Sequence, residues 1–104
     1  MNLRGKQKRY LRSQAHAMKP IFQIGKDGVD KKWLTQVKVA IEKRELIKIN
    51  ILNNSLLEPS DVQEYVESNS RIQVVQVIGH TLVLFKRADK KENRSYSNEV
   101  VKIQ

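Results

Sequence analysis

Residues 21–51 read IFQIGKDGVDKKWLTQVKVAIEKRELIKINI, and the order of patterns within this stretch sets the architecture of the chain. A short apolar run at 21–24 is followed by a glycine-containing loop and by a helical pattern that begins at Asp30, a favoured N-cap residue. The apolar residues of this helix recur at three- and four-residue spacing: Trp33, Leu34, Val37, Ala40 and Ile41. Residues 46–52 then alternate apolar and polar, as a half-buried strand does. A strand, a helix and a second strand predict a crossover connection within one sheet.

The flanking segments complete the expected order of elements. Residues 3–17 have helical spacing, and Lys19-Pro20 ends that helix because the residue before proline prefers extended geometry. Ser60 and Gln63 fit a capping box at the start of a third helix. Residues 71–78 and 81–86 are two strands, and the Gly79-His80 pair between them suits a type II′ hairpin.

The expected fold is therefore a compact α/β domain of order α-β-α-β-α-β-β, with a four-stranded mixed sheet. Its length of 104 residues fits one domain. We expect residues 1–87 to form this domain and residues 88–104 to be a polar tail, with at most weak structure at 100–103.

Composition limits the class of protein. The chain has no cysteine, which excludes disulfides and thiolate metal sites, and we expect no metal or cofactor. No apolar run approaches the roughly 20 residues of a membrane span, and the charged N-terminus lacks the apolar core of a secretory signal. We therefore expect a soluble, cytoplasmic monomer without contact to a membrane.

Positive charge is concentrated at one end of the sequence. The net charge is +9, and residues 1–44 hold twelve Lys and Arg against three acids, whereas residues 45–104 hold eight of each. A one-sided field concentrates a polyanion at one surface. The alternative is a solvated run of charges without a ligand.

The predicted binding surface begins with the first helix. Arg4, Lys8 and Arg12 recur every four residues, and like charges at this spacing repel each other unless a polyanion neutralises them. The residues that we expect to contact RNA are Arg4, Lys6, Lys8, Arg9, Arg12, Lys19, Gly25, Lys26, Gly28, Lys31 and Lys32.

The Gly25-Lys26-Asp27-Gly28 loop is the second part of that surface. A G-x-x-G turn between a strand and a helix directs backbone N–H groups toward a phosphate, and Lys26 adds a mobile charge. Two glycines at this spacing also occur in turns that bind nothing. Asp27 either repels a phosphate or hydrogen-bonds the loop backbone.

Enzymatic interpretations are poor, and we expect no catalytic activity. His16 and His80 are distant in sequence, no nucleophile motif is present, and the acids lie mainly on the third helix. We expect His80 to be a residue of the hairpin turn and not a ligand or a base. Tyr10 and Phe22 lie close to the basic segments, where they either stack a base or pack in the core.

Five stretches of the chain form one recognisable combination: LRGKQKRYLR at 3–12, Lys19-Pro20, IGKDGV at 24–29, ELIKI at 45–49 and VQVIGHTLVLFKR at 75–87. Together they resemble the CRM domain (chloroplast RNA splicing and ribosome maturation), in its single-domain YhbY-like bacterial form. The resemblance implies a fold similar to the C-terminal domain of initiation factor three. It also implies RNA binding and association with precursors of the large ribosomal subunit.

The chain departs from the family pattern at three places. His80 follows the hairpin glycine where bacterial relatives often have Lys or Arg, Asn69-Ser70 replaces a common Thr-Gly, and Phe85 stands where Tyr is common. The expected function is an assembly factor that binds rRNA through phosphate contacts. The alternatives are a protein-docking adaptor that uses the acidic third helix, and a non-specific nucleic-acid binder.

Overall fold

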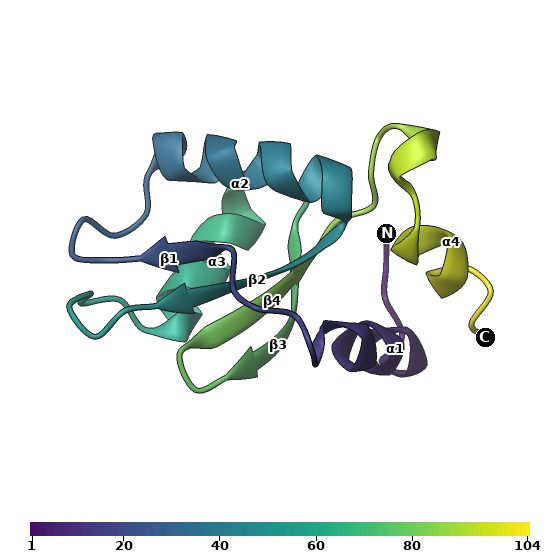
Figure 1. Cartoon of the computed structure of the whole chain (residues 1–104), viewed down its shortest axis with the longest axis horizontal. Helices are drawn as coiled ribbons and strands as arrows, with labels where there is room; N and C mark the ends of the chain where they lie inside the picture. Colours follow the sequence, from purple (N-terminus) through teal and green to yellow (C-terminus); the bar gives the residue numbers. More distant parts are fainter.

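A computed structural model describes residues 1–104. Its sheet has the strand order β1-β2-β4-β3, with β1 parallel to β2 and the other neighbours antiparallel (Figure 1). The strands are β1 (Phe22–Ile24), β2 (Leu46–Ile51), β3 (Gln73–Ile78) and β4 (Thr81–Phe85). The predicted four-stranded mixed sheet is confirmed.

Helices cover both faces of the sheet (Figure 1). One face packs against α2 (Lys31–Arg44) and α3 (Pro59–Asn69), which enclose a core that includes Ile47, Ile49 and Leu82. The opposite face packs against α1 (Gly5–Ala15) and α4 (Tyr96–Val100) around Phe85. Alternation along β2 and β4 divides their side chains between these two cores.

The predicted helix starts are confirmed for α2 and wrong for α3. The Asp30 carboxylate caps α2 by accepting the Trp33 N–H at 2.8 Å. Helix α3 begins with Pro59, and Glu58 is its N-cap residue, so the capping box joins Glu58 to Asp61 and not Ser60 to Gln63. Proline at the first helical position is pre-set for helix entry, which moves the start toward the N-terminus.

The β3–β4 hairpin turns as the sequence predicts. Gly79 has a φ of +56°, and His80 is not among the residues with positive φ. Positive φ at only the first of the two loop residues fits a type II′ turn. His80 is exposed, in keeping with a turn residue.

Residues 88–104 differ from the polar tail that the sequence predicts, because they fold back onto the domain. They contain a 3-10 helix, η1 (Lys91–Asn93), and α4, and the Val100 side chain is fully buried against the α1 face of the sheet. Gln7 donates from Nε2 to the Val100 carbonyl at 3.1 Å. These contacts are between residues far apart in sequence, so no local periodicity reveals them.

Glu45 fixes this C-terminal segment to the domain. Its buried carboxylate accepts hydrogen bonds from the Ala88 N–H at 2.7 Å, the Ser97 N–H at 3.0 Å and the Ser97 hydroxyl at 2.6 Å. Glu45 also ends α2 with a φ of 63°, in the region that side chains other than glycine rarely adopt. The three buried hydrogen bonds stabilise a backbone conformation that is itself unfavourable.

Candidate nucleic-acid interface

Helix α1 exposes its basic side chains because its other face is buried. Gln7, Leu11 and Ala15 are the buried residues, each about one turn from the next. Gln7 is polar yet buried. Its Oε1 accepts the N–H of Arg4, the N-cap residue, at 2.7 Å, so Gln7 stabilises the N-terminus of α1. The remaining faces carry the predicted cations Arg4, Lys6, Lys8, Arg9 and Arg12.

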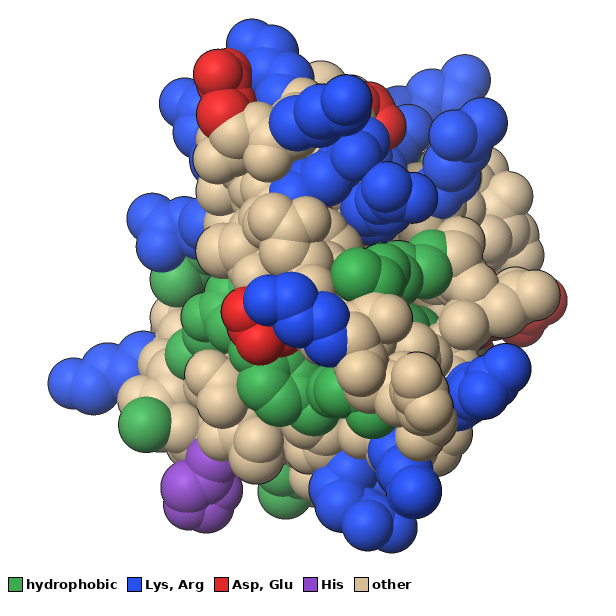
Figure 2. All heavy atoms as spheres, turned by 90° about the vertical axis from the view of Figure 1, so that its right-hand side faces the viewer, with side chains coloured by type: hydrophobic (Ala, Val, Ile, Leu, Met, Phe, Trp, Pro, Cys, Tyr) green, Lys and Arg blue, Asp and Glu red, His purple; other side chains and the backbone are tan.

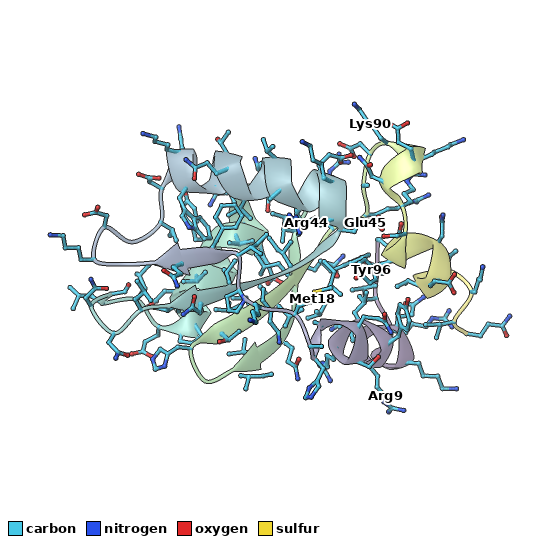
Figure 3. All side chains as sticks on the ribbon, viewed as in Figure 1. Arg9, Met18, Arg44, Glu45, Lys90 and Tyr96 are labelled. Carbon is cyan, nitrogen blue, oxygen red and sulfur yellow. The ribbon has the colours of Figure 1, made fainter.

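Arg12 has a structural contact as well as an exposed position. Its Nε donates to the Val75 carbonyl of β3 at 2.9 Å, which ties α1 to the sheet. Arg9, in contrast, points away from the sheet into solvent (Figure 3). The Arg9 guanidinium is therefore fully available for contact with a ligand. The Arg12 guanidinium already donates one hydrogen bond to β3, so only its remaining N–H groups are available.

The glycine loop between β1 and α2 is a tight turn. The Gly28 N–H donates to the Gly25 carbonyl at 3.1 Å, and Gly28 has a φ of +69°. Lys26 and Asp27 are exposed at its tip, and the Asp27 carboxylate makes no hydrogen bond or ion pair. The hypothesis that Asp27 hydrogen-bonds the loop backbone is therefore not supported by this structure.

A hollow of about 430 Å³ lies beside the loop. Its lining includes Lys26 and Lys32, but also the carboxylates of Asp27 and Asp30, so its charges balance. The indole Nε1 of Trp33, which lines the same hollow, has no hydrogen-bond partner although it is buried. Three polar residues of this lining come from separate elements, so no local sequence pattern points to them: Gln23, Gln36 and Asn54.

The structure divides the predicted surface into two basic clusters. The α1 cluster, with Arg4, Lys6, Lys8, Arg9 and Arg12, lies at one end of the long axis of the molecule, and the loop cluster, with Gly25, Lys26, Gly28, Lys31 and Lys32, lies at the other (Figure 1). That axis measures 40 Å. Lys19 lies on the connection between α1 and β1, and therefore between the two clusters.

None of the predicted cations takes part in an ion pair. The three ion pairs of the molecule join Lys86 to Glu42, Lys86 to Asp89, and Lys102 to Glu99. Figure 2 shows the face that carries α1 and α4, where Lys and Arg side chains gather along two opposite edges and hydrophobic side chains lie between them. Free cations at this density attract a polyanion.

The aromatic side chains near the basic segments pack inward. Tyr10 is half-buried against α4, and burial first, then the charges of Glu99 and Tyr96, raise the pKa of its hydroxyl. Phe22 packs against the core between the sheet and α2. Both side chains are therefore partly buried against the cores, which supports the second of the two roles that the sequence left open.

The acidic residues of α3 lie on the side of the sheet that α1 does not cover. Glu58, Asp61, Glu64 and Glu67 are exposed there, and Glu67 accepts the Val74 N–H at 3.0 Å. No group of three or more His, Cys, Asp or Glu side chains is placed to hold a metal ion. None of the helices is both long and apolar enough to cross a membrane.

A four-stranded mixed sheet with a basic N-terminal helix and a G-x-x-G loop defines a small α/β domain whose exposed cations suit a polyanionic ligand. The chain belongs to the CRS1/YhbY (CRM) domain family, whose model matches residues 3–86. The C-terminal segment beyond residue 86, which includes Tyr96, lies outside this match.

Relatives agree with this assignment. The chain is 50% identical over 92 residues to the "Probable RNA-binding protein YqeI" of Bacillus subtilis, which covers 88% of this chain and 94% of the relative. It is 27% identical over 84 residues to a protein of Haemophilus influenzae named "RNA-binding protein", and the match covers 81% of this chain and 85% of that protein. The solution structure of SAV1595 from Staphylococcus aureus matches with a TM-score of 0.71 and 41% identity, over 86% of this chain and 94% of that one.

Proposed function

We propose that this protein binds RNA and acts as an assembly factor on precursors of the large ribosomal subunit. The observation that carries the proposal is the set of cations on α1 and around the glycine loop, none of which has an acidic partner. Like charges four residues apart on α1 destabilise the helix, and a polyanion bound along it removes that repulsion. The names of its relatives support RNA as the polyanion.

The spacing of the two clusters favours a folded RNA over a short linear segment. They lie at opposite ends of a 40 Å axis, so one ligand that contacts both must be long or folded. Contacts of Lys and Arg to phosphate carry no sequence information. Specificity then follows from the shape of the rRNA and from the surrounding particle, in which the protein acts as a cytoplasmic monomer.

Salt dependence tests the phosphate contacts. With roughly five contacts, the logarithm of the affinity should fall with the logarithm of salt concentration at a slope of about −3.5 to −4.5. A flat response would favour a protein-docking adaptor that uses α3. Equal affinity for duplex DNA and for rRNA would favour a non-specific nucleic-acid binder.

Sedimentation of cell lysate through a sucrose gradient tests the assembly role. The protein should travel with the precursor of the large subunit and leave those fractions at high salt. Replacing Lys8 and Arg9 by glutamine should reduce this association, while replacing exposed Glu64 on α3 should not. A protein that stays at the top of the gradient would contradict the proposal.

A further inference from the structure

A second cavity lies beside the connection from α1 to β1, and no sequence motif points to it. It measures about 420 Å³, within the range of small-ligand sites. One wall is the connection from α1 to β1, with Met18, Lys19 and Ile21. The opposite walls are the last turn of α2 and the start of α4.

The charge of this cleft is one-sided. Lys19, Lys43, Arg44 and Lys48 line it, and no carboxylate does. None of these cations is in an ion pair. The hollow beside the glycine loop, in contrast, contains as many acids as lysines. A phosphate is therefore attracted more strongly to the cleft than to the loop hollow.

Apolar side chains share the cleft with these cations. Met18 and Tyr96 line it beside Arg44, and Figure 3 shows the three residues together around the space between α2, α4 and the start of β1. Ile21 adds apolar surface and is 43% exposed. An apolar, partly aromatic wall next to free cations matches the two halves of a nucleotide, a base and a phosphate.

The cleft is held in shape before any ligand enters. The Lys48 ammonium donates to the His16 carbonyl at 3.2 Å and to the Met18 carbonyl at 3.1 Å, which fixes the connection beyond α1. The Glu45 carboxylate holds Ser97, next to Tyr96, and is itself turned away into the protein. Both walls therefore require little ordering on binding, which lowers the entropic cost.

The cleft also lies on the path between the two clusters. The connection at residues 16–21 runs from α1 to β1, and the glycine loop follows β1 directly (Figure 1). An RNA that contacts α1 and the loop along this side passes the mouth of the cleft.

We propose that this cleft receives one unpaired nucleotide of the bound RNA, with its base against Met18 and Tyr96 and its phosphate at Lys19, Lys43 and Arg44. The proposal rests on the proposed RNA binding and deepens it. It makes the C-terminal segment part of the binding site, because Tyr96 supplies the aromatic wall.

Amide NMR shifts test the site without any substitution. Adenosine monophosphate should shift the amide signals of Ile21, Lys48 and Tyr96, and ribose 5-phosphate, which lacks the base, should shift them much less. Shifts confined to the glycine loop would overturn the proposal. A polyglutamate peptide that produces the same shifts as the nucleotide would also overturn it, in favour of an acidic protein partner.

Binding to two RNAs tests the occupant. One probe is a fully paired hairpin, and the other is the same hairpin with an unpaired 3′ extension of three nucleotides. The wild-type protein should bind the extended hairpin about tenfold more tightly, the effect of one stacked base. Removing the bases from the extension should remove most of this difference, and equal binding of base-free and complete extensions would refute the site.

Substitutions separate this proposal from the proposed function. Tyr96→Leu should remove most of the tenfold preference and Arg44→Gln part of it, whereas Lys91→Gln, an equal loss of charge on exposed η1, should leave it intact. Arg44 is exposed on α2, so its substitution reports on the cleft even if Tyr96→Leu loosens α4. If both cleft variants keep the preference while Lys8→Gln weakens all RNA binding, the cleft proposal fails and RNA binding stands. Failure of the wild type to bind either hairpin would overturn both.

Discussion

Replacing Glu45 by alanine should destabilise the protein more than any exposed acidic substitution. The change removes a buried carboxylate that accepts three hydrogen bonds from the C-terminal segment. Two N–H groups and one hydroxyl then lose their partner, at about 1–3 kcal/mol each. Because the segment can shift and admit water, we expect the lower part of that sum, about 3–5 kcal/mol.

Backbone strain at Glu45 gives a second, separable contribution. Alanine at a φ of 63° keeps the strain, whereas glycine adopts this conformation readily. Glu45→Gly should therefore lose the same hydrogen bonds but be about 1 kcal/mol more stable than Glu45→Ala. Glu45→Gln keeps one acceptor oxygen and should lie between the wild type and alanine.

Urea denaturation followed by Trp33 fluorescence measures these differences. With a slope of about 1–3 kcal/mol per molar urea, Glu45→Ala should lower the midpoint by about 2 M. Glu92→Gln, on the same C-terminal segment but exposed and in no ion pair, is the matched control and should leave the midpoint unchanged. An unchanged midpoint for Glu45→Ala, with native amide signals for residues 88–104, would refute the view that this carboxylate holds the segment.

Three further predictions concern the loop, the pH dependence and the salt dependence. Gly28→Ala should lower the free energy of unfolding by about 1–2 kcal/mol, measured in a thermal or urea melt, because the φ of Gly28 is +69°. Gly25→Ala should be nearly neutral, because its added Cβ would lie 3.6 Å from the Asn54 Oδ1. Equal effects of the two substitutions would contradict this difference. Hydrogen bonds from the Asp89 N–H first, and then other contacts to Lys90, Asn93 and Lys86, lower the pKa of Glu42 in the folded protein. The stabilisation from Glu42 is therefore complete above its ordinary pKa of 4.5 and disappears as the pH falls through the lowered value, so Glu42→Gln should flatten the acid branch of the stability curve. The slope of log RNA affinity against log salt concentration should become shallower in Lys8→Gln and in Arg9→Gln, by about 0.7–0.9 for each phosphate that the lost side chain neutralises. An unchanged slope would show that the residue does not contact RNA phosphate.

Local patterns in the sequence predict most of the fold. Alternation in β2, the Asp30 cap of α2 and the Gly79 turn depend on neighbours within a few residues, and each appears as expected. The predicted start of α3 is wrong because two overlapping capping signals are present, and Pro59 favours the earlier one. The cations of α1 are also evident from sequence, since charge and helical spacing are both local properties.

Periodicity and composition alone establish which elements form, in what order, and that an excess of positive charge lies in the N-terminal part. How those charges are arranged depends on packing, which yields two separate clusters and a cleft completed by Tyr96. Packing also makes residues 88–104 part of the folded domain. One cause underlies all of these features, because each depends on contacts between residues that are distant in the chain. The hydrogen bonds from Ser97 to Glu45 and from Gln7 to Val100 are single contacts of this kind, and such contacts leave no periodic trace in the sequence.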